Sequence, residues 1–400
     1  MRMLKTALVL SCFAVGLTAQ SGGKLFVRPP QGLTPPYSPA ITAGGLVYVS
    51  GMLPTDAKGV LVQGDITAQT RQVFDNLRGV LTQAGSSLNN VVSTTVMLQN
   101  AADFAAMDKF YATQFTGEPP ARTTVMGDMV RPGALLEIQV TAVPNGAERK
   151  VILPAGWMKP TSPYNYAIQS GDTLFMSGLV SRNGKDNSVV AGDIAVQTKT
   201  AMDNAGEILK AAGMSYGDLV SSRVAIRDIA RFADMNKVYA AYWEKDRPAR
   251  ATVQSGLPGT FDVEITFVAI KGSSPREVVI PPAADGKPGQ AGPNFSPAIK
   301  VGNRLFVSGG MGSTTATQGD MRAQTAEALT RLVRILRFAG FDTRDVVATD
   351  VWIANVAQFG DMNEGYQPVF PSDPPVRATV GVGALASASA LVEIGLTAVK

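Results

Sequence analysis

The hydrophobic positions of this chain change their period several times, which predicts strands and helices in a fixed order. Residues 90–99 alternate between apolar and polar side chains, and 46–51, 121–127 and 134–143 are predicted strands as well. Residues 65–85 have helical spacing instead, with Asp65 placed to cap the helix and Gly85 to end it. The apolar positions of this helix are Ile66, Val73, Leu77, Leu81 and Ala84.

A second helix is predicted at residues 101–115, where Phe104, Met107, Tyr111 and Phe115 lie down one side. The resulting order, β-β-α-β-α-β-β, is typical of an α+β sandwich, in which one sheet carries two helices on one face. The other face of such a sheet needs a cover.

The same sequence pattern occurs three times along the chain. "YSPAITAGGLVYVSG" at 37–51 returns as "YNYAIQSGDTLFMSG" at 164–178 and "FSPAIKVGNRLFVSG" at 295–309. Fixed internal spacings predict three related domains of about 105 residues each, a usual domain size. We place them at 24–144, 151–271 and 277–400, with the Pro/Gly-rich segments 145–163 and 272–294 as linkers. We expect the three sheets to pack around a pseudo-threefold axis, so that one chain covers its own free sheet faces.

The composition excludes several classes of catalytic and metal-binding site. The 400 residues carry a net charge of only +4 and contain no histidine. Histidine bases, Ser-His or Cys-His nucleophiles and histidine metal sites are therefore excluded. No long basic run suggests a nucleic-acid surface. No metal constellation and no glycine-rich nucleotide loop is present, so we expect no metal and no cofactor.

The first twenty residues, "MRMLKTALVLSCFAVGLTAQ", predict a signal peptide. A positive start precedes an apolar stretch too short to span a bilayer, and small residues then allow cleavage near Ala19 or Gln20. A buried N-terminal helix and a lipoprotein acylated at Cys12 are the alternatives. The expected location is periplasmic or secreted, with no membrane attachment after cleavage.

An arginine recurs within a short phrase in each repeat: "PPARTTV", "RPARATV" and "PPVRATV". It follows an acidic or amide residue by fourteen positions each time, in the pairs Asp108 and Arg122, Asn236 and Arg250, Asn363 and Arg377. A guanidinium fork suits a carboxylate ligand, because it makes two parallel charge-assisted hydrogen bonds. An ion pair or a strand-end arginine is the structural alternative.

Together these motifs resemble the Rid family (YjgF/RidA, also called L-PSP endoribonuclease) over nearly all of each repeat. Members of that family are small homotrimers with ligand clefts between neighbouring subunits. Its RidA branch hydrolyses reactive enamines and imines, such as 2-aminoacrylate, to 2-keto acids and ammonia. The resemblance implies that three fused domains imitate the trimer, as a monomeric pseudo-trimer.

The resemblance also assigns roles to residues. It implies that Arg122, Arg250 and Arg377 bind the substrate carboxylate, and that Glu137, Glu264 and Glu393 position the attacking water. The alternative for the glutamates is a sheet carboxylate that pairs with a neighbouring base. Further expected substrate-binding residues are Tyr37, Tyr164, Phe295, Ser50, Gly51, Ser177, Gly178, Ser308, Gly309, Asp108, Asn236 and Asn363. In the Ser-Gly pairs, the glycine would let the backbone approach the ligand; a plain strand end is the alternative.

Two positions depart from the pattern. Repeat 3 has Phe295 where the others have tyrosine, and repeat 1 has Asp108 where the others have asparagine. If Asp108 faced the site, its charge would oppose an anionic ligand; it could equally be a solvated helix residue.

The leading hypothesis is a hydrolase of imines or enamines, acting as a 2-imino acid deaminase. A binder of small carboxylates without turnover is the main alternative. An endoribonuclease and a structural protein, with the arginines at its interfaces, are the others. The expected partner is a small carboxylate or imine, and no nucleic acid.

Overall fold

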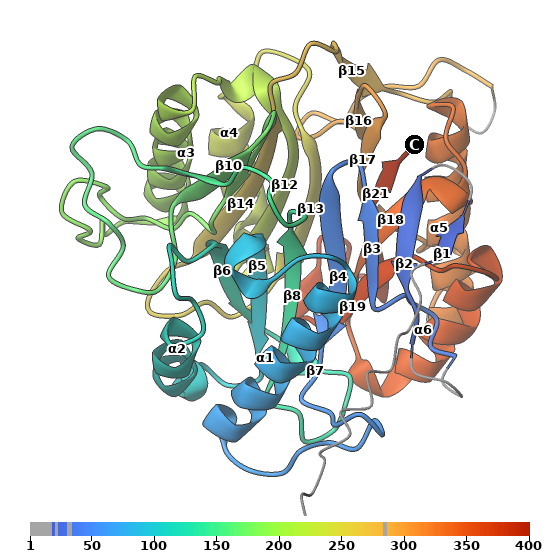
Figure 1. Ribbon diagram of the computed structural model, residues 1–400. Coiled ribbons are helices and arrows are strands. Elements are labelled where there is room, and N and C mark those ends of the chain that lie inside the picture. Colours follow the sequence, from blue (N-terminus) through green and yellow to red (C-terminus); the bar gives the residue numbers. More distant parts are fainter. Residues whose placement is uncertain (1–17, 21–22, 30–33, 283–285) are drawn as a thin grey trace, which may run out of the picture.

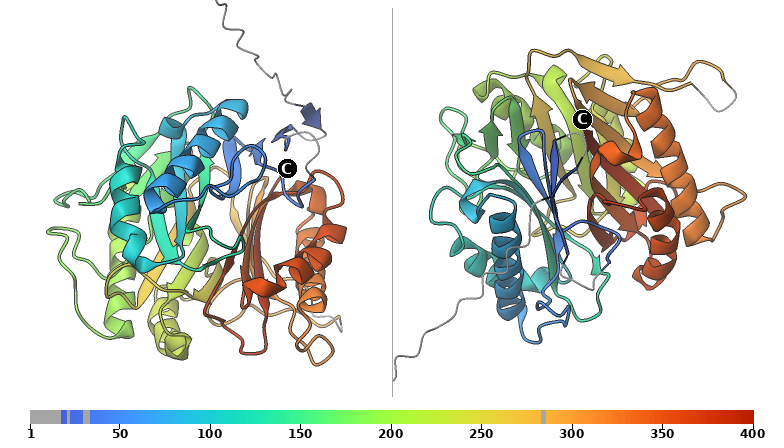
Figure 2. Two further views of the ribbon diagram at one scale, coloured as in Figure 1. Left: turned by 90° about the horizontal axis from the view of Figure 1, so that it is seen from below. Right: turned by 45° about the vertical axis from the view of Figure 1, so that its right-hand side comes forward.

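The computed structural model describes residues 18–20, 23–29, 34–282 and 286–400. Most of the predicted signal peptide, residues 1–17, lies outside the described residues. The three repeats form three sheets that meet at the centre of the molecule, while helices α1 to α6 cover the outside (Figure 1). The two further views in Figure 2 show the same arrangement. The predicted α+β class and pseudo-trimer are thus confirmed.

Each repeat contributes two helices and the strands of one sheet. Repeat 1 contains β1 (Thr18–Gln20), β2 (Lys24–Val27), β3 (Ala40–Ala43), β4 (Leu46–Met52), α1 (Ile66–Gln83), β5 (Val91–Leu98), α2 (Phe104–Ala112), β6 (Ala121–Met126), β7 (Asp128–Met129) and β8 (Leu136–Ala142). Repeat 2 contains β9 (Lys150–Ile152), β10 (Ala167–Ser170), β11 (Thr173–Met176), α3 (Ile194–Ala211), β12 (Leu219–Ile226), α4 (Phe232–Ala240), β13 (Ala249–Gln254) and β14 (Val263–Ile270). Repeat 3 contains β15 (Arg276–Val279), β16 (Ala298–Val301), β17 (Arg304–Met311), α5 (Met321–Phe338), β18 (Val346–Ile353), α6 (Phe359–Tyr366), β19 (Val376–Gly381), β20 (Ala384–Leu385) and β21 (Val392–Val399).

The first helix of each repeat starts and ends where its sequence predicts. In α1 the Asp65 side chain accepts a hydrogen bond from the backbone N–H of Ala68 at 2.9 Å. Gly85 has a φ of 72°, a left-handed conformation that glycine adopts without steric cost. Asp193 and Asp320 cap α3 and α5 in the same way.

Strand pairing is antiparallel except for one pair in each sheet. Strands β5 and β6 are parallel, as are β12 with β13 and β18 with β19. The motif arginine lies on this parallel pair. In repeat 1, Arg122 on β6 lies opposite Thr94 on β5. The arginine strand is therefore at one side of its own sheet, where it can face the next repeat.

The predicted linker segments overlap the starts of the predicted domains at residues 151 and 277, and two short strands lie there. Residues 150–152 and 276–279, inside segments predicted as linkers, form strands β9 and β15. Each pairs antiparallel with the strand that follows it, as β2 does with β3. These strands are short, and their partners lie across a long Pro/Gly-rich stretch, so local sequence gives little sign of them.

The repeats also exchange short strands, which the sequence pattern did not predict. Strand β7 of repeat 1 extends the sheet of repeat 3 beside β19, and β20 of repeat 3 extends the sheet of repeat 2 beside β13. The backbone N–H of Met126 in repeat 1 donates to the carbonyl of Gly256 in repeat 2. Each repeat thus protects an edge strand of a neighbour, which closes the ring.

The inner faces of the sheets bury a shared core. One cluster joins Ile41 and Val92 of repeat 1, Ile168 of repeat 2 and Val376 of repeat 3. This is the cover that each sheet face required, and it comes from the other repeats. No helix among the described residues is long and apolar enough to cross a membrane.

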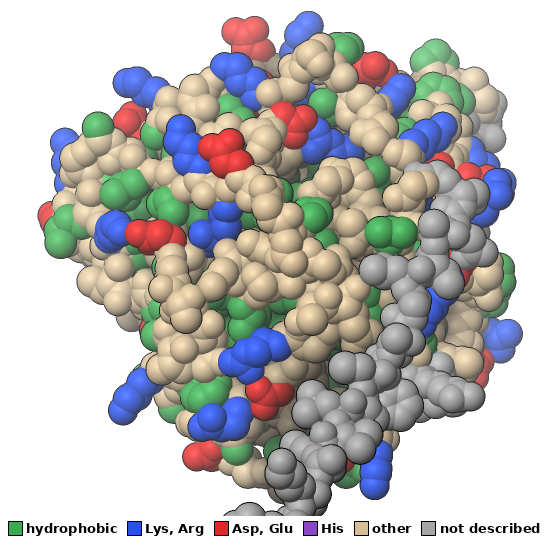
Figure 3. Space-filling model, viewed as in Figure 1, with side chains coloured by type: hydrophobic (Ala, Val, Ile, Leu, Met, Phe, Trp, Pro, Cys, Tyr) green, Lys and Arg blue, Asp and Glu red, His purple; other side chains and the backbone are tan. Residues whose placement is uncertain are grey.

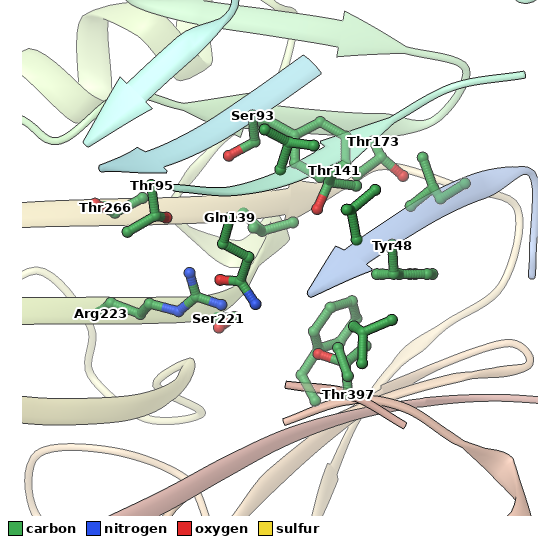
Figure 4. A pocket seen from close by; sticks show the side chains of 18 of the residues that line it. Tyr48, Ser93, Thr95, Gln139, Thr141, Thr173, Ser221, Arg223, Thr266 and Thr397 are labelled. Carbon is green, nitrogen blue, oxygen red and sulfur yellow. The ribbon is translucent and has the colours of Figure 1, made fainter. Parts of the chain in front are cut away.

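A cavity of about 90 Å³, lined by both apolar and polar side chains, lies where the sheets meet (Figure 4). Its lining includes Ser93, Thr95, Gln139, Ser221, Arg223, Thr266 and Thr397. The motif arginines do not line it, so this cavity is separate from the sites described next.

Candidate active sites between the repeats

The motif arginine of each repeat lies against the Ser-Gly pair of the next repeat. The backbone N–H of Arg122 donates to Oγ of Ser177 at 2.8 Å. Arg250 makes the same bond to Ser308 at 2.8 Å, and Arg377 makes it to Ser50 at 2.9 Å. The ring is therefore closed in the order 1, 2, 3 and back to 1.

These contacts define three sites, which we name by the repeats that form them. Site 1/2 holds Arg122 and Asp108 with Tyr164, Ser177, Gly178 and Glu264. Site 2/3 holds Arg250 and Asn236 with Phe295, Ser308, Gly309 and Glu393. Site 3/1 holds Arg377 and Asn363 with Tyr37, Ser50, Gly51 and Glu137. Contacts place the arginine, aromatic, Ser-Gly and glutamate residues and Asp108 in these sites, and Asn236 and Asn363 are assigned to theirs because they occupy the helix position of Asp108.

Each arginine side chain is enclosed by aromatic rings. The guanidinium carbon of Arg377 lies 4.7 Å from the ring centroid of Tyr366 and 5.6 Å from that of Phe359, both on α6. The ring of Tyr37, from repeat 1, lies at 5.6 Å. Cation–π attraction and the loss of water fix such a guanidinium in place.

Each site also contains a tyrosine from the second helix of a repeat, and the sequence did not identify this tyrosine as part of the site. Tyr111, Tyr239 and Tyr366 are fully buried, and the hydroxyl of each is bonded to a side chain on the central strand: Thr94, Ser222 and Thr349. In each repeat a phenylalanine precedes this tyrosine by seven positions, or two helical turns, and that shared spacing was the available signal.

The buried arginines keep nitrogens without a partner. Within the described part of the chain, Nη1 of Arg122, Nη1 and Nη2 of Arg250, and Nη1 of Arg377 have no hydrogen-bond partner, although all three side chains are about 5% exposed or less. Burial lowers the pKa of Arg250 and of Arg377 from the usual value for arginine. A buried cation with free donors is costly, and an anionic ligand would satisfy it.

The glutamates lie in the same sites, at the other side of the repeat boundary. Oε1 of Glu264 accepts from the backbone N–H of Thr124 at 3.4 Å, and Oε1 of Glu393 accepts from that of Thr252 at 3.3 Å. Each threonine follows a motif arginine by two residues. Burial raises the pKa of Glu137, Glu264 and Glu393 to about 8, against smaller opposite effects of the threonine N–H and the arginine. Near neutral pH these groups are therefore mainly neutral acids.

The glycines of the Ser-Gly pairs lie against the site glutamates. A Cβ atom on Gly51 would lie 1.7 Å from Oε1 of Glu137, so the glycine makes room for the carboxyl group. Gly178 and Gly309 stand in the same relation to Glu264 and Glu393. The expectation that these glycines also let the backbone approach a ligand stays a prediction.

The serine hydroxyls also have structural partners. Oγ of Ser50 accepts from Arg377 and donates to the carbonyl of Ser38 at 2.7 Å. Ser177 and Ser308 make the equivalent pairs of bonds. These hydroxyls connect neighbouring repeats and place the arginine strand.

Asp108 faces the site and is not a solvated helix residue. Its Oδ1 lies 2.6 Å from Nη2 of Arg122, and the two side chains are 18% and 3% exposed. Phe295 takes the tyrosine position, with its ring 5.5 Å from the guanidinium of Arg250. Among the described residues no group of three His, Cys, Asp or Glu could hold a metal ion.

Comparison with known proteins agrees with the geometry. The sequence profile of the family described as "Endoribonuclease L-PSP" matches residues 31–144, 157–271 and 287–400. A "RutC family protein" of Sulfurisphaera tokodaii is 44% identical over 115 residues, which are 28% of this chain and 92% of that protein. The "3-aminoacrylate deaminase RutC" of Acinetobacter baylyi is 42% identical over 117 residues, which are 28% of this chain and 93% of that protein.

The chain is also similar in sequence to proteins of known structure. The crystal structure of the YjgF gene product from E. coli is 31% identical and covers 31% of this chain and 99% of its own, with a TM-score of 0.29. Three profile matches cover most of the sequence, one to each repeat. The chain therefore belongs to the Rid (endoribonuclease L-PSP) family and carries three copies of its domain.

Proposed function

We propose that the inter-repeat sites hydrolyse imines and enamines of small 2-keto acids, releasing ammonia. The observation that carries this proposal is a pair of buried groups across one repeat boundary. An arginine with unpartnered guanidinium nitrogens lies on one side, and a glutamate with a pKa of about 8 lies on the other. The relative named a 3-aminoacrylate deaminase supports the same reaction class.

The arginine would bind the substrate carboxylate through its fork. This contact fixes one end of a planar imino acid and leaves its C=N bond toward the neighbouring repeat, which supplies the glutamate. The free donors of Arg250 and Arg377 favour this binding, since a ligand carboxylate replaces bonds that the described residues do not provide.

The glutamate can act first as an acid and then as a base. Its neutral form gives a proton to the imine nitrogen, which makes the carbon more electrophilic. The carboxylate then takes a proton from the water that adds to that carbon. The acid returns this proton to the nitrogen, and the C–N bond breaks as the carboxylate accepts the hydroxyl proton. The products are a 2-keto acid and ammonia, and the glutamate ends protonated as it began.

The older family label, endoribonuclease, has less support in this chain. There is no histidine to act as a general base. On the face shown in Figure 3, basic and acidic side chains are interspersed and form no basic stripe that would follow a phosphate backbone.

The test is an imine-hydrolysis assay. An L-amino-acid oxidase generates the 2-imino acid, semicarbazide traps it, and hydrolysis by the protein lowers the rate of semicarbazone formation. We expect a clear decrease with the unchanged protein and none with a variant in which Glu137, Glu264 and Glu393 are all replaced by glutamine. Glu277→Gln, at an exposed carboxylate, is the matched control. Carboxylate binding without any change in trapping would support the binder instead.

A further inference from the structure

The order in which the repeats meet places the two departures from the family pattern in different sites. Asp108 lies in site 1/2, because the arginine strand and helix of repeat 1 face repeat 2. Phe295 lies in site 2/3, beside Arg250. Site 3/1 combines Asn363 and Arg377 with Tyr37 and so keeps the full set.

We propose that site 3/1 is the one fully equipped carboxylate site of this chain, that site 2/3 is weakened, and that Asp108 closes site 1/2 to carboxylates. The inference rests on the proposed function for the class of ligand, a small 2-keto or 2-imino acid.

Site 1/2 already contains an internal anion. The carboxylate of Asp108 is 2.6 Å from the guanidinium of Arg122, in surroundings where the arginine is 3% exposed. The pair has no net charge, so an incoming carboxylate gains little attraction from Arg122 and meets the repulsion of Asp108 at close range. Asp108 thus supplies Arg122 with a counter-ion, although Nη1 of Arg122 has no hydrogen-bond partner among the described residues.

Sites 2/3 and 3/1 have a neutral amide at this position. Oδ1 of Asn236 and Oδ1 of Asn363 are buried and have no hydrogen-bond partner within the described residues. The arginines of these two sites have unpartnered nitrogens, as does Arg122, but among the described residues neither Arg250 nor Arg377 has a carboxylate within ion-pair distance. Both sites therefore keep a buried positive charge without a counter-ion, which an anionic ligand would supply.

Site 2/3 differs from site 3/1 by one hydroxyl. The ring of Phe295 lies 5.5 Å from its arginine, and that of Tyr37 lies 5.6 Å from its own, so the aromatic wall is the same. Only the polar atom at the edge of the ring is missing. We expect this loss to weaken binding about 2- to 10-fold, as for one neutral hydrogen bond.

Site 3/1 joins the first repeat to the last. The strand with Ser50 and the strand with Glu137 belong to repeat 1, while the arginine and its aromatic enclosure belong to repeat 3. Site 3/1 therefore forms only when repeats 1 and 3 are in contact, which couples full ligand binding to the meeting of the two ends of the chain.

Calorimetry with 2-ketobutyrate, an unreactive product-like carboxylate, tests the inference. The unchanged protein should bind one tight and one weaker equivalent. Asp108→Asn should add a further equivalent, because it frees Arg122. Asp234→Asn is the matched control, since it makes the same change on the equivalent helix at a half-exposed aspartate that pairs with Lys237 and not with a motif arginine, and it should add none. Arg377→Ala should abolish the tight equivalent, and Phe295→Tyr should strengthen the weaker one.

Three equal equivalents in the unchanged protein would overturn the inference, as would an unchanged stoichiometry in a folded Asp108→Asn variant. Absence of any binding heat at millimolar ligand would also overturn it. If Asp108→Asn does not fold, the stoichiometry of the unchanged protein and the effect of Arg377→Ala still test whether the three sites are unequal. Unequal binding without imine hydrolysis would sink the proposed function and leave this inference standing, because the ligand used here does not react.

Discussion

Arg223 and Asp350 form an ion pair across the centre of the molecule, although they occupy equivalent positions in successive repeats. Arg223 follows Ser222, which pairs with Arg250, and Asp350 follows Thr349, which pairs with Arg377. The equivalent residue of repeat 1 is Thr95. A symmetric trimer of identical chains would place one residue type at all three positions, so this unlike pair requires a fused chain.

We expect Asp350→Thr to lower the free energy of unfolding by about 1 kcal/mol or less, because Arg223 is partly exposed and water screens the pair. Adding Arg223→Thr should restore most of this loss, since all three equivalent positions would then carry threonine, the residue that repeat 1 already has at Thr95. Urea denaturation of both single variants and the double variant measures the coupling. Additive effects would show that the ion pair contributes nothing.

Gly51→Ala should displace the carboxyl group of Glu137, because the new Cβ would lie 1.7 Å from its Oε1. We expect a large loss of imine hydrolysis and a cost in stability of about 1–3 kcal/mol. Gly79→Ala is the control: a Cβ there meets nothing within 4 Å, and alanine in a helix is favoured by about 0.5–1 kcal/mol. Full activity of Gly51→Ala would show that the carboxyl position is not critical.

The three site glutamates should make the protein less stable as pH rises. Their pKa values are about 8 in the folded protein and near 4.5 when exposed, so the folded state binds more protons between these values. The free energy of unfolding should therefore fall from about pH 4.5 to about pH 8. Urea denaturation across this range measures it, and replacing all three by glutamine should remove most of the slope.

The same pKa values predict the pH dependence of hydrolysis. If the neutral acid starts the reaction, kcat/KM should fall as pH rises through about 8. A profile that rises through this value would indicate that the glutamate acts only as a base. The Glu137→Gln variant should lack the transition that belongs to site 3/1.

Light scattering should give the mass of a single chain, near 42 kDa. The sheet faces are already covered within the chain, and edge strands β13 and β19 are paired with β20 and β7 of other repeats. A stable trimer of chains in dilute solution would contradict this expectation.

Protein isolated from its native host should begin near residue 20 or 21, as the charged start and apolar run predict. Loss of residues 18–20 would remove β1, which pairs only with β2 at the edge of its sheet. We therefore expect the shortened chain to fold normally. Intact-mass spectrometry decides, and a mature chain that keeps Met1 would count against export.

The sequence by itself determined the repeats, the first helix of each with its aspartate cap, and the arginine, glutamate and glycine positions, because these depend on local periodicity and fixed spacing. It could not determine strands β9 and β15, whose pairing is set by distant residues. Nor could it show that Gly51 makes room for Glu137, since the two are 86 positions apart in the chain. The tertiary structure alone decided which repeat faces which, and hence that Asp108 meets Arg122 while Tyr37 meets Arg377. Contacts between repeats depend on how the three sheets pack around an axis. A local pattern of hydrophobic positions cannot predict which repeat will contact which.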